Sequence, residues 1–210
     1  MEWNQLKIGR NDRAAVIGRT GSGKTFLARY LIEDGNKRYS VTYDAKASES
    51  ISGWGQPIIT NFEELQQSDE RRIIYRPDHF EASDPFLQNR FFEWVYLRQH
   101  TRLFVDEAYA VRGGTSSGSY FSACLTRGRE RGISTIIGTQ RPSRIPLETF
   151  SEAEHFYIFQ LTWPADQQRI YELSGGLLTV EQQLTLNEHE FFYFNVFSGL
   201  YPKKIIINPI

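Results

Sequence analysis

The segment from Gly18 to Thr25 has the residue types and the spacing that bind phosphate. It reads Gly-Arg-Thr-Gly-Ser-Gly-Lys-Thr and matches the P-loop pattern G-x-x-x-x-G-K-[ST]. Its three glycines allow a tight turn whose backbone N–H groups point at phosphate oxygens. In such a loop Lys24 reaches the β- and γ-phosphates, and the Thr25 hydroxyl holds Mg²⁺. We therefore expect a nucleotide-phosphate site formed by Gly18, Arg19, Thr20, Gly21, Ser22, Gly23, Lys24, Thr25 and Phe26.

The residues on either side of this segment agree with that interpretation. The apolar run 14–17 precedes it and suits a buried strand, and residues 25–33 are expected to form a helix. A helix N-terminus offers unpaired N–H groups and the positive end of the helix dipole to an anion. The alternative is a glycine-rich turn with a chance lysine, and the strand-then-helix context counts against it.

Two adjacent acids end a second apolar segment. Residues 102–107 are expected to form a buried strand that ends in Asp106 and Glu107. An aspartate in this position can hold the Mg²⁺ of a bound nucleotide, usually through water. Glu107 can polarise a water for attack on the γ-phosphate, which favours hydrolysis over binding alone. The alternative is a solvated Asp-Glu pair at a strand–loop junction.

Gln140 follows a third apolar segment, the strand expected at 133–139. Its side chain can contact the γ-phosphate or the attacking water. The alternative is a loop glutamine that satisfies nearby backbone groups.

Three arginines precede that strand, and they alternate along a segment expected to be helical. Alternate residues do not share a helix face, so Arg127, Arg129 and Arg131 cannot all reach one phosphate. We expect one of them, Arg129 before Arg127, to act in trans as an arginine finger on a neighbouring subunit. The alternative is a solvated basic helix end, which the helix dipole favours. Arg19 is a second source of positive charge, in cis.

The whole chain alternates between strand and helix patterns. Strands are expected at 2–9, 14–17, 40–44, 72–76, 102–107, 133–139, 155–161, 190–197 and 203–208. Helices are expected at 25–33, after Asn61, from Asp84 to His100, and at 120–131, 165–173 and 180–185, with a loop at 45–57. This order predicts an α/β fold with a mostly parallel sheet flanked by helices on both faces. The last two strands are expected to form a hairpin that turns at Ser198-Gly199.

Ligands of such sheets bind at the carboxyl ends of the strands. The sequence places Gly18, the pair Asp106-Glu107, and Gln140 at three such ends. Their convergence is stronger evidence for a nucleotide site than any of the motifs alone.

Composition places the chain among ordinary globular proteins. It has 210 residues, 40% of them hydrophobic and 23% charged, and is expected to form one α/β domain over residues 1–210. Its only cysteine, Cys124, excludes an intramolecular disulfide and suits a reducing compartment. No apolar run approaches the ~18 residues of a membrane span, and residues 1–5 lack a signal-peptide layout. These features predict a cytoplasmic protein without direct membrane insertion.

Charge and histidine content add little. The net charge of −1 gives the whole protein no attraction to nucleic acid. It does not exclude such a partner, because a ring-shaped assembly of subunits can line its central channel with a few basic residues from each subunit. The chain has four histidines without metal-ligand spacing, which are expected to be structural or solvated: His79, His100, His155 and His189.

The motifs together resemble the FtsK/HerA superfamily of P-loop DNA-pumping ATPases. The resemblance spans residues 14–145 and is most specific in the run R-G-I-x-x-I-I-x-T-Q-R-P, from Arg131 to Pro142. Asp44-Ala45-Lys46 also resembles the D-P-K of that group, without its proline. In its size the chain is most similar to the small genome-packaging ATPases of bacterial and archaeal viruses.

This resemblance implies a RecA/ASCE-type fold and a pentameric or hexameric ring with ATP and Mg²⁺ at subunit interfaces. Double-stranded DNA would occupy the pore and be bound through its phosphates, without sequence preference. Arg112 and the Gly/Ser-rich segment 112–119 are candidates for a DNA-facing element, the alternative being an ordinary surface loop. A capsid vertex or a membrane protein is a further partner, and the host cytoplasm or the virion is the expected location.

Three functional hypotheses follow. The leading one is an ATP-hydrolysing motor that translocates double-stranded DNA and packages a viral genome. A cellular helicase or conjugation-type translocase is a second. The third is an ATP-dependent switch or assembly factor, against which Glu107 argues, because a switch has less need of a general base. Ring size, transport direction and the adenine-contacting residues stay open at this point.

Overall fold

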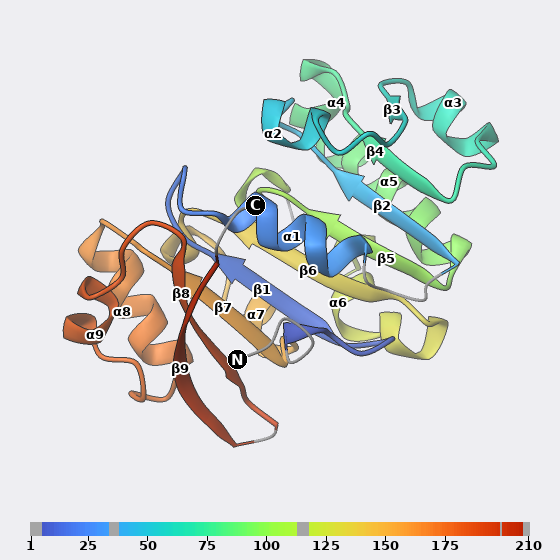
Figure 1. The fold of residues 1–210 in the computed structure, drawn as a ribbon. Coiled ribbons are helices and arrows are strands. Elements are labelled where there is room, and N and C mark those ends of the chain that lie inside the picture. Colours follow the sequence, from blue (N-terminus) through green and yellow to red (C-terminus); the bar gives the residue numbers. More distant parts are fainter. Residues whose placement is uncertain (1–5, 34–37, 113–117, 198, 208–210) are drawn as a thin grey trace.

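A single mixed sheet organises the fold (Figure 1). The computed structural model describes residues 6–33, 38–112, 118–197 and 199–207. The strands are β1 Arg13–Ile17, β2 Tyr39–Tyr43, β3 Ile58–Ile59, β4 Arg72–Tyr75, β5 Thr101–Val105, β6 Ser134–Thr139, β7 His155–Phe159, β8 Glu190–Asn195 and β9 Leu200–Ile206. They lie in the order β3-β4-β2-β5-β6-β1-β7-β8-β9. Strands β1 to β7 are parallel, and β8 and β9 add an antiparallel hairpin.

Several of the helices begin at a residue whose side chain caps the first turn. The helices are α1 Lys24–Glu33, α2 Glu49–Ser52, α3 Phe62–Gln67, α4 His79–Ser83, α5 Pro85–Arg98, α6 Tyr120–Thr126, α7 Glu148–Ser151, α8 Pro164–Leu173 and α9 Val180–Leu184. The Asn61 side chain accepts a hydrogen bond from the first turn of α3, as predicted. Asp84 caps α5 in the same way, and Pro85 occupies the first helical position.

Helices cover both faces of the sheet because strand side chains alternate between them. Ala14 and Val16 of β1 face a core that contains Leu27 and Leu31 of α1. The alternate residues Ala15 and Ile17 belong to the second core, which is filled by α5 and α6 among others. In Figure 1, α1 lies in front of the sheet and α6 and α7 lie behind it. The predicted fold class, with its C-terminal hairpin, is confirmed.

Several local expectations were wrong. The segment 45–57 contains the short helix α2, and the strand β3 and helix α4 were not expected. The helix expected at 120–131 ends at Thr126 and gives way to the 3-10 turn Gly128–Arg131, where a Cβ on Gly128 would make a tight contact of 3.1 Å with the Ile133 Cβ. Residues 6–9 are not a strand. Residues 2–5, and Ser198 of the expected hairpin turn, lie outside the described residues.

The parallel register brings the three predicted strand ends to one edge of the sheet, here called the carboxyl edge. β6 lies between β5 and β1, with Ile137 opposite Val105 and Thr139 opposite Ile17. Gly138 permits this approach, because a Cβ on it would overlap the Asp106 carbonyl. The opposite edge, where these strands begin, is the amino edge. In the described parts of the chain no helix has the length and apolar character needed to cross a bilayer.

Candidate functional site

The P-loop is anchored between two neighbouring strands at the carboxyl edge. The Gly18 N–H donates to the Thr139 carbonyl at 3.0 Å, and the Arg19 N–H donates to the Gln160 carbonyl at 2.9 Å. Gly21 and Gly23 have φ angles of 77° and 103°, which a residue with a side chain adopts only with strain. The motif therefore folds as the sequence predicts, into a tight turn that leads directly into α1.

A cavity of about 560 Å³ opens above this turn. The P-loop and the first residues of α1, through Phe26, form one wall. The rest of the lining includes four residues at or just after the ends of β2, β5 and β6, namely Lys46, Asp106, Glu107 and Gln140, together with Ser48, Ser50 and His189. The structure thus brings residues of all three predicted motifs into one cavity.

Lys24 is a buried cation, and no charged side chain among the described residues contacts it directly. Its Nζ donates to the Arg19 carbonyl of its own loop at 2.8 Å. Burial lowers the pKa of Lys24 to about 8, although the nearby Glu107 and Asp106 carboxylates oppose the shift. A phosphate bound in the loop would give this ammonium the counter-charge that the neutral carbonyl does not.

The backbone also fits a phosphate chain. Within the described residues, no group accepts a hydrogen bond from the N–H of Gly21, Gly23 or Lys24. These donors sit at the N-terminus of α1, where the helix dipole adds positive potential. The P-loop is therefore a preformed anion cradle.

The donor set also suits Mg²⁺, since the Thr25 hydroxyl and the Asp106 carboxylate line the same cavity. Burial raises the pKa of Asp106 to about 6, and the negative charges of Glu107 and Asp44 add to the effect. A divalent cation would relieve this crowding of acids. Bound there, it would neutralise charge on the β- and γ-phosphate oxygens.

Glu107 is held by one hydrogen bond and one ion pair. Only 3% of the residue is exposed. One carboxylate oxygen accepts from the Gln140 N–H at 2.9 Å, and the other lies 3.0 Å from Lys46 Nζ. Burial disfavours the Lys46 ammonium, but the Glu107 carboxylate and Tyr109 together outweigh it and raise the pKa of Lys46. The predicted base and the predicted sensor residue are therefore neighbours.

Lys46 was not predicted as a site residue, although Asp44-Ala45-Lys46 contributed to the family resemblance. Asp44 is fully buried and pairs with Arg76 at 2.7 Å. The Asp44 carboxylate also accepts from the Ser48 N–H at 3.1 Å. These bonds fix the loop that carries Lys46 over the cavity.

Gln140 and Arg19 connect the P-loop to its two flanks. The Thr20 hydroxyl donates to the Gln140 side-chain carbonyl at 2.6 Å, on the β6 side. Arg19 donates to Gln160 at 2.6 Å and pairs with Glu188 at 3.3 Å, on the β7 and β8 side. The Arg19 side chain therefore lies on the β7 and β8 side of the P-loop, whereas Glu107 lies on the β6 side.

Arg127 and Arg129 do not reach the cavity of their own chain. They precede β6, at the amino edge of the sheet, whereas the P-loop lies at the carboxyl edge. Arg129 forms an ion pair there with Glu154, which directly precedes β7. A role in trans stays a prediction.

The candidate DNA-facing element is described only at its ends. Arg112 is exposed, and its N–H donates to the Gln88 side chain at 2.7 Å. Residues 113–117 lie outside the described residues, so the DNA-binding expectation for 112–119 stays a prediction as well.

His189 is a cavity residue that the sequence did not indicate. It was expected to be structural or solvated, and no motif surrounds it. In the structure it directly precedes β8 and lies beside Gly23 of the P-loop.

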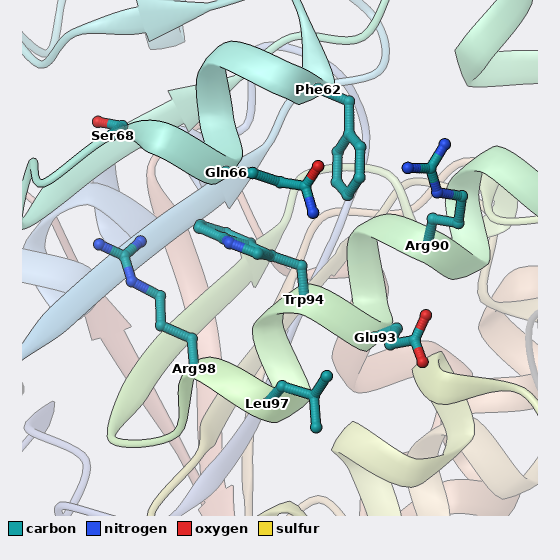
Figure 2. Close-up of a pocket in the computed structure, with 8 residues that line it drawn as sticks. All are labelled: Phe62, Gln66, Ser68, Arg90, Glu93, Trp94, Leu97 and Arg98. Atoms are coloured by element: carbon teal, nitrogen blue, oxygen red, sulfur yellow. The ribbon is translucent and has the colours of Figure 1, made fainter.

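A second hollow, of about 400 Å³, lies between α3 and α5. Figure 2 shows Trp94 below Gln66, with Arg90 and Arg98 at opposite ends. Each guanidinium lies over an aromatic ring: Arg98 is 4.7 Å from the Trp94 ring centroid, and Arg90 is 4.9 Å from that of Phe62. None of the residues predicted from the sequence line it, and it has no glycine-rich N–H cradle. We therefore assign nucleotide binding to the P-loop cavity.

Comparisons with known proteins agree with this geometry. No protein-family profile matches the chain. The DNA packaging ATPase P9 of Enterobacteria phage PRD1 is 28% identical to it over 163 residues, which cover 75% of this chain and 68% of that protein. The genome packaging NTPase B204 of Sulfolobus turreted icosahedral virus 2, solved in complex with AMP, superposes with a TM-score of 0.74 at 21% identity, covering 97% of this chain and all of that one. The resemblance to FtsK/HerA-type P-loop ATPases is confirmed.

The similarity in fold extends beyond viral proteins. VirB4 of Thermoanaerobacter pseudethanolicus superposes with a TM-score of 0.66 at 10% identity, covering 95% of this chain and 89% of that one. The mostly parallel sheet flanked by helices is therefore shared with both groups.

Proposed function

We propose that this chain is an ATP-hydrolysing motor that translocates double-stranded DNA and packages a viral genome into a capsid, with residues 1–210 acting as one P-loop ATPase unit. The observation that carries the proposal is the position of Glu107. It is buried at the rim of the P-loop cavity, between Lys46 and the Gln140 N–H. The names of the similar proteins, a DNA packaging ATPase and a genome packaging NTPase, support the same function.

The residues divide the chemistry of hydrolysis among them. Lys24 and the P-loop N–H groups hold the β- and γ-phosphates of ATP, and Thr25 and Asp106 would hold Mg²⁺. Glu107 accepts a proton from the attacking water, whose oxygen bonds to the γ-phosphorus as the bond to the bridging β–γ oxygen breaks. The Gln140 side chain orients that water. The products are ADP and phosphate, and the proton passes from Glu107 to solvent.

The positions of Arg127 and Arg129 support a ring. Both lie at the amino edge, so neither can contact the γ-phosphate of its own chain. In a head-to-tail pentamer or hexamer, Arg129, or else Arg127, would reach the γ-phosphate bound by the next subunit. ATP and Mg²⁺ would then lie at each subunit interface.

The proposed DNA contacts are independent of sequence. Arg112 and the segment 112–119 would face the backbone phosphates, because loops that track DNA bind its charge and not its base edges. A capsid vertex or a membrane protein would be the docking partner, and the host cytoplasm or the virion the site of action.

ATP turnover in the presence of long duplex DNA tests the proposal. We expect linear duplex to stimulate phosphate release at about 50 mM salt and to lose most of its effect at about 200 mM, because phosphate contacts weaken steeply with salt. The Lys24→Ala variant gives the background rate. Duplex DNA that neither binds at low salt nor changes turnover would refute the motor. Native mass spectrometry with a non-hydrolysable ATP analogue tests the ring, and a strictly monomeric protein would favour the switch hypothesis.

A further inference from the structure

His189 closes the nucleotide cavity on the side away from the proposed base. The residue directly precedes β8, which begins at the carboxyl edge beside Phe159. A Cβ built on Gly23 would lie 3.1 Å from His189 Nδ1, so the imidazole packs directly against the P-loop. The preceding residue, Glu188, pairs with Arg19 of the same loop. The segment before β8 is thus tied to the P-loop at two points.

The order of the strands determines which part of ATP faces His189. The P-loop follows β1, and β1 lies between β6 and β7. Glu107 and Gln140 follow β5 and β6, so the γ-phosphate must point toward that side of the loop. The phosphate chain then crosses the P-loop, and the nucleoside lies on the β7 and β8 side. His189 is the cavity-lining residue contributed by that side.

The backbone at His189 is strained in the way that functional positions often are. Its φ is 62°, in the left-handed region that only a few per cent of residues other than glycine adopt, histidine being one of the types found there more often. The Ile207 N–H, which follows β9, donates to the His189 carbonyl at 2.8 Å and holds this conformation. Within the described residues, neither ring nitrogen has a hydrogen-bond partner. The strained backbone therefore presents an imidazole with unused polar atoms to the cavity.

We propose that His189 is a binding residue for the nucleoside half of ATP. The imidazole offers a flat ring for a base and a hydrogen-bonding nitrogen for a base edge or a ribose hydroxyl. Phe26, 43% exposed at the start of α1, lines the same cavity and adds an aromatic surface. The inference rests on the proposed function, because it takes ATP as the ligand.

Binding of ATP and of inorganic tripolyphosphate, measured by calorimetry on the same protein, tests the assignment. Tripolyphosphate carries the phosphate chain without a nucleoside. His189→Asn removes the ring and suits the left-handed backbone, and His189→Gly relieves the strain entirely. We expect both variants to bind ATP about three- to tenfold more weakly, the range of an aromatic contact, and to bind tripolyphosphate as the wild type does. His79→Asn, an exposed histidine at the start of α4, is the matched control and should change neither affinity.

Three results would overturn the inference. Unchanged ATP affinity in both variants would exclude a contact. An equal loss for ATP and for tripolyphosphate would mean that His189 only supports the shape of the P-loop. A wild type that binds both ligands equally well would have no nucleoside site. Each readout is a binding equilibrium, so a protein that binds ATP but shows no DNA-stimulated turnover would refute the motor and leave this inference standing.

Discussion

Replacing Glu107 with glutamine separates the chemical step from every other property of the site. The amide has the shape of the carboxylate, and its oxygen can still accept from the Gln140 N–H, which now lies 2.9 Å from Glu107. The substitution removes the proton acceptor and the ion pair to Lys46. The P-loop groups that hold phosphate are unchanged, so we expect ATP binding to be retained.

The structure sets the size of each effect. Lys46 has a side chain that is 38% exposed, so solvent screens its ion pair with Glu107, which we value at less than about 1 kcal/mol. A loss of that size lowers the thermal midpoint by no more than about 2–4 °C in a chain of this length. A missing general base slows turnover by about 10²- to 10⁴-fold. That rate loss corresponds to about 3–6 kcal/mol in the barrier, at about 1.4 kcal/mol per factor of ten.

Steady-state phosphate release at saturating ATP and Mg²⁺ measures the effect, with the thermal midpoint and the ATP dissociation constant taken on the same samples. Glu63→Gln, which changes an exposed acid on α3, is the control and should leave all three quantities unchanged. Turnover within tenfold of the wild type, in a protein that folds and binds ATP normally, would show that Glu107 is not the base.

Three further predictions concern packing, pH and the partner subunit. Gly138→Ala forces a methyl group onto the Asp106 carbonyl, so we expect thermal unfolding to show a loss of about 1–3 kcal/mol, with turnover falling as well. Burial lowers the pKa of His155 below 6.5, although Asp12 opposes the shift. The unfolded chain therefore takes up the proton more readily, and stability present above pH 6.5 is lost as the pH falls below it; His155→Gln should flatten this part of the profile of thermal midpoint against pH. Arg129→Ala should reduce turnover by about 10³-fold or more, and mixing it with Lys24→Ala subunits should restore part of the activity, because some interfaces then combine an intact P-loop with an intact finger.

Each of these has its own control or contrary result. Gly53→Ala is the packing control, since its new Cβ would meet no atom closer than 3.8 Å, and equal losses in the two variants would contradict the packing argument. A His155→Gln profile that falls as steeply as the wild type between pH 7 and pH 5 would exclude His155 as a source of the acid sensitivity. Mixed subunits that stay as inactive as either parent would argue against a finger in trans.

The sequence predicted the edge of the sheet where the site lies, because parallel strands end together. Gly18, Asp106 and Gln140 each follow an apolar strand. Because strands alternate with helices along the chain, those strands were predicted to be parallel. Adjacency in the sheet then placed the three ends side by side. Boundaries were less reliable where local propensity is weak, as at α2 and at the turn Gly128–Arg131.

Contacts between segments that are far apart in the chain could not be predicted from the sequence. The ion pair between Lys46 and Glu107 exists because the Asp44–Arg76 pair fixes the loop after β2, and no local pattern encodes that pairing. His189 has no motif at all. It reaches Gly23 because β8 runs antiparallel to β7 and therefore begins at the carboxyl edge, where the P-loop lies.

The sequence by itself predicted the chemistry proposed for this protein: a phosphate-binding loop, an acid pair and a glutamine beside it, whose types and spacing are local properties of the chain. The tertiary structure decided the surroundings of that chemistry. It paired Lys46 with Glu107, the proposed base, and directed Arg19 toward β7 and β8. It also packed His189 against the P-loop, on the side opposite Glu107. Those placements depend on strand order and on ion pairs between distant loops, which spacing along the chain does not specify.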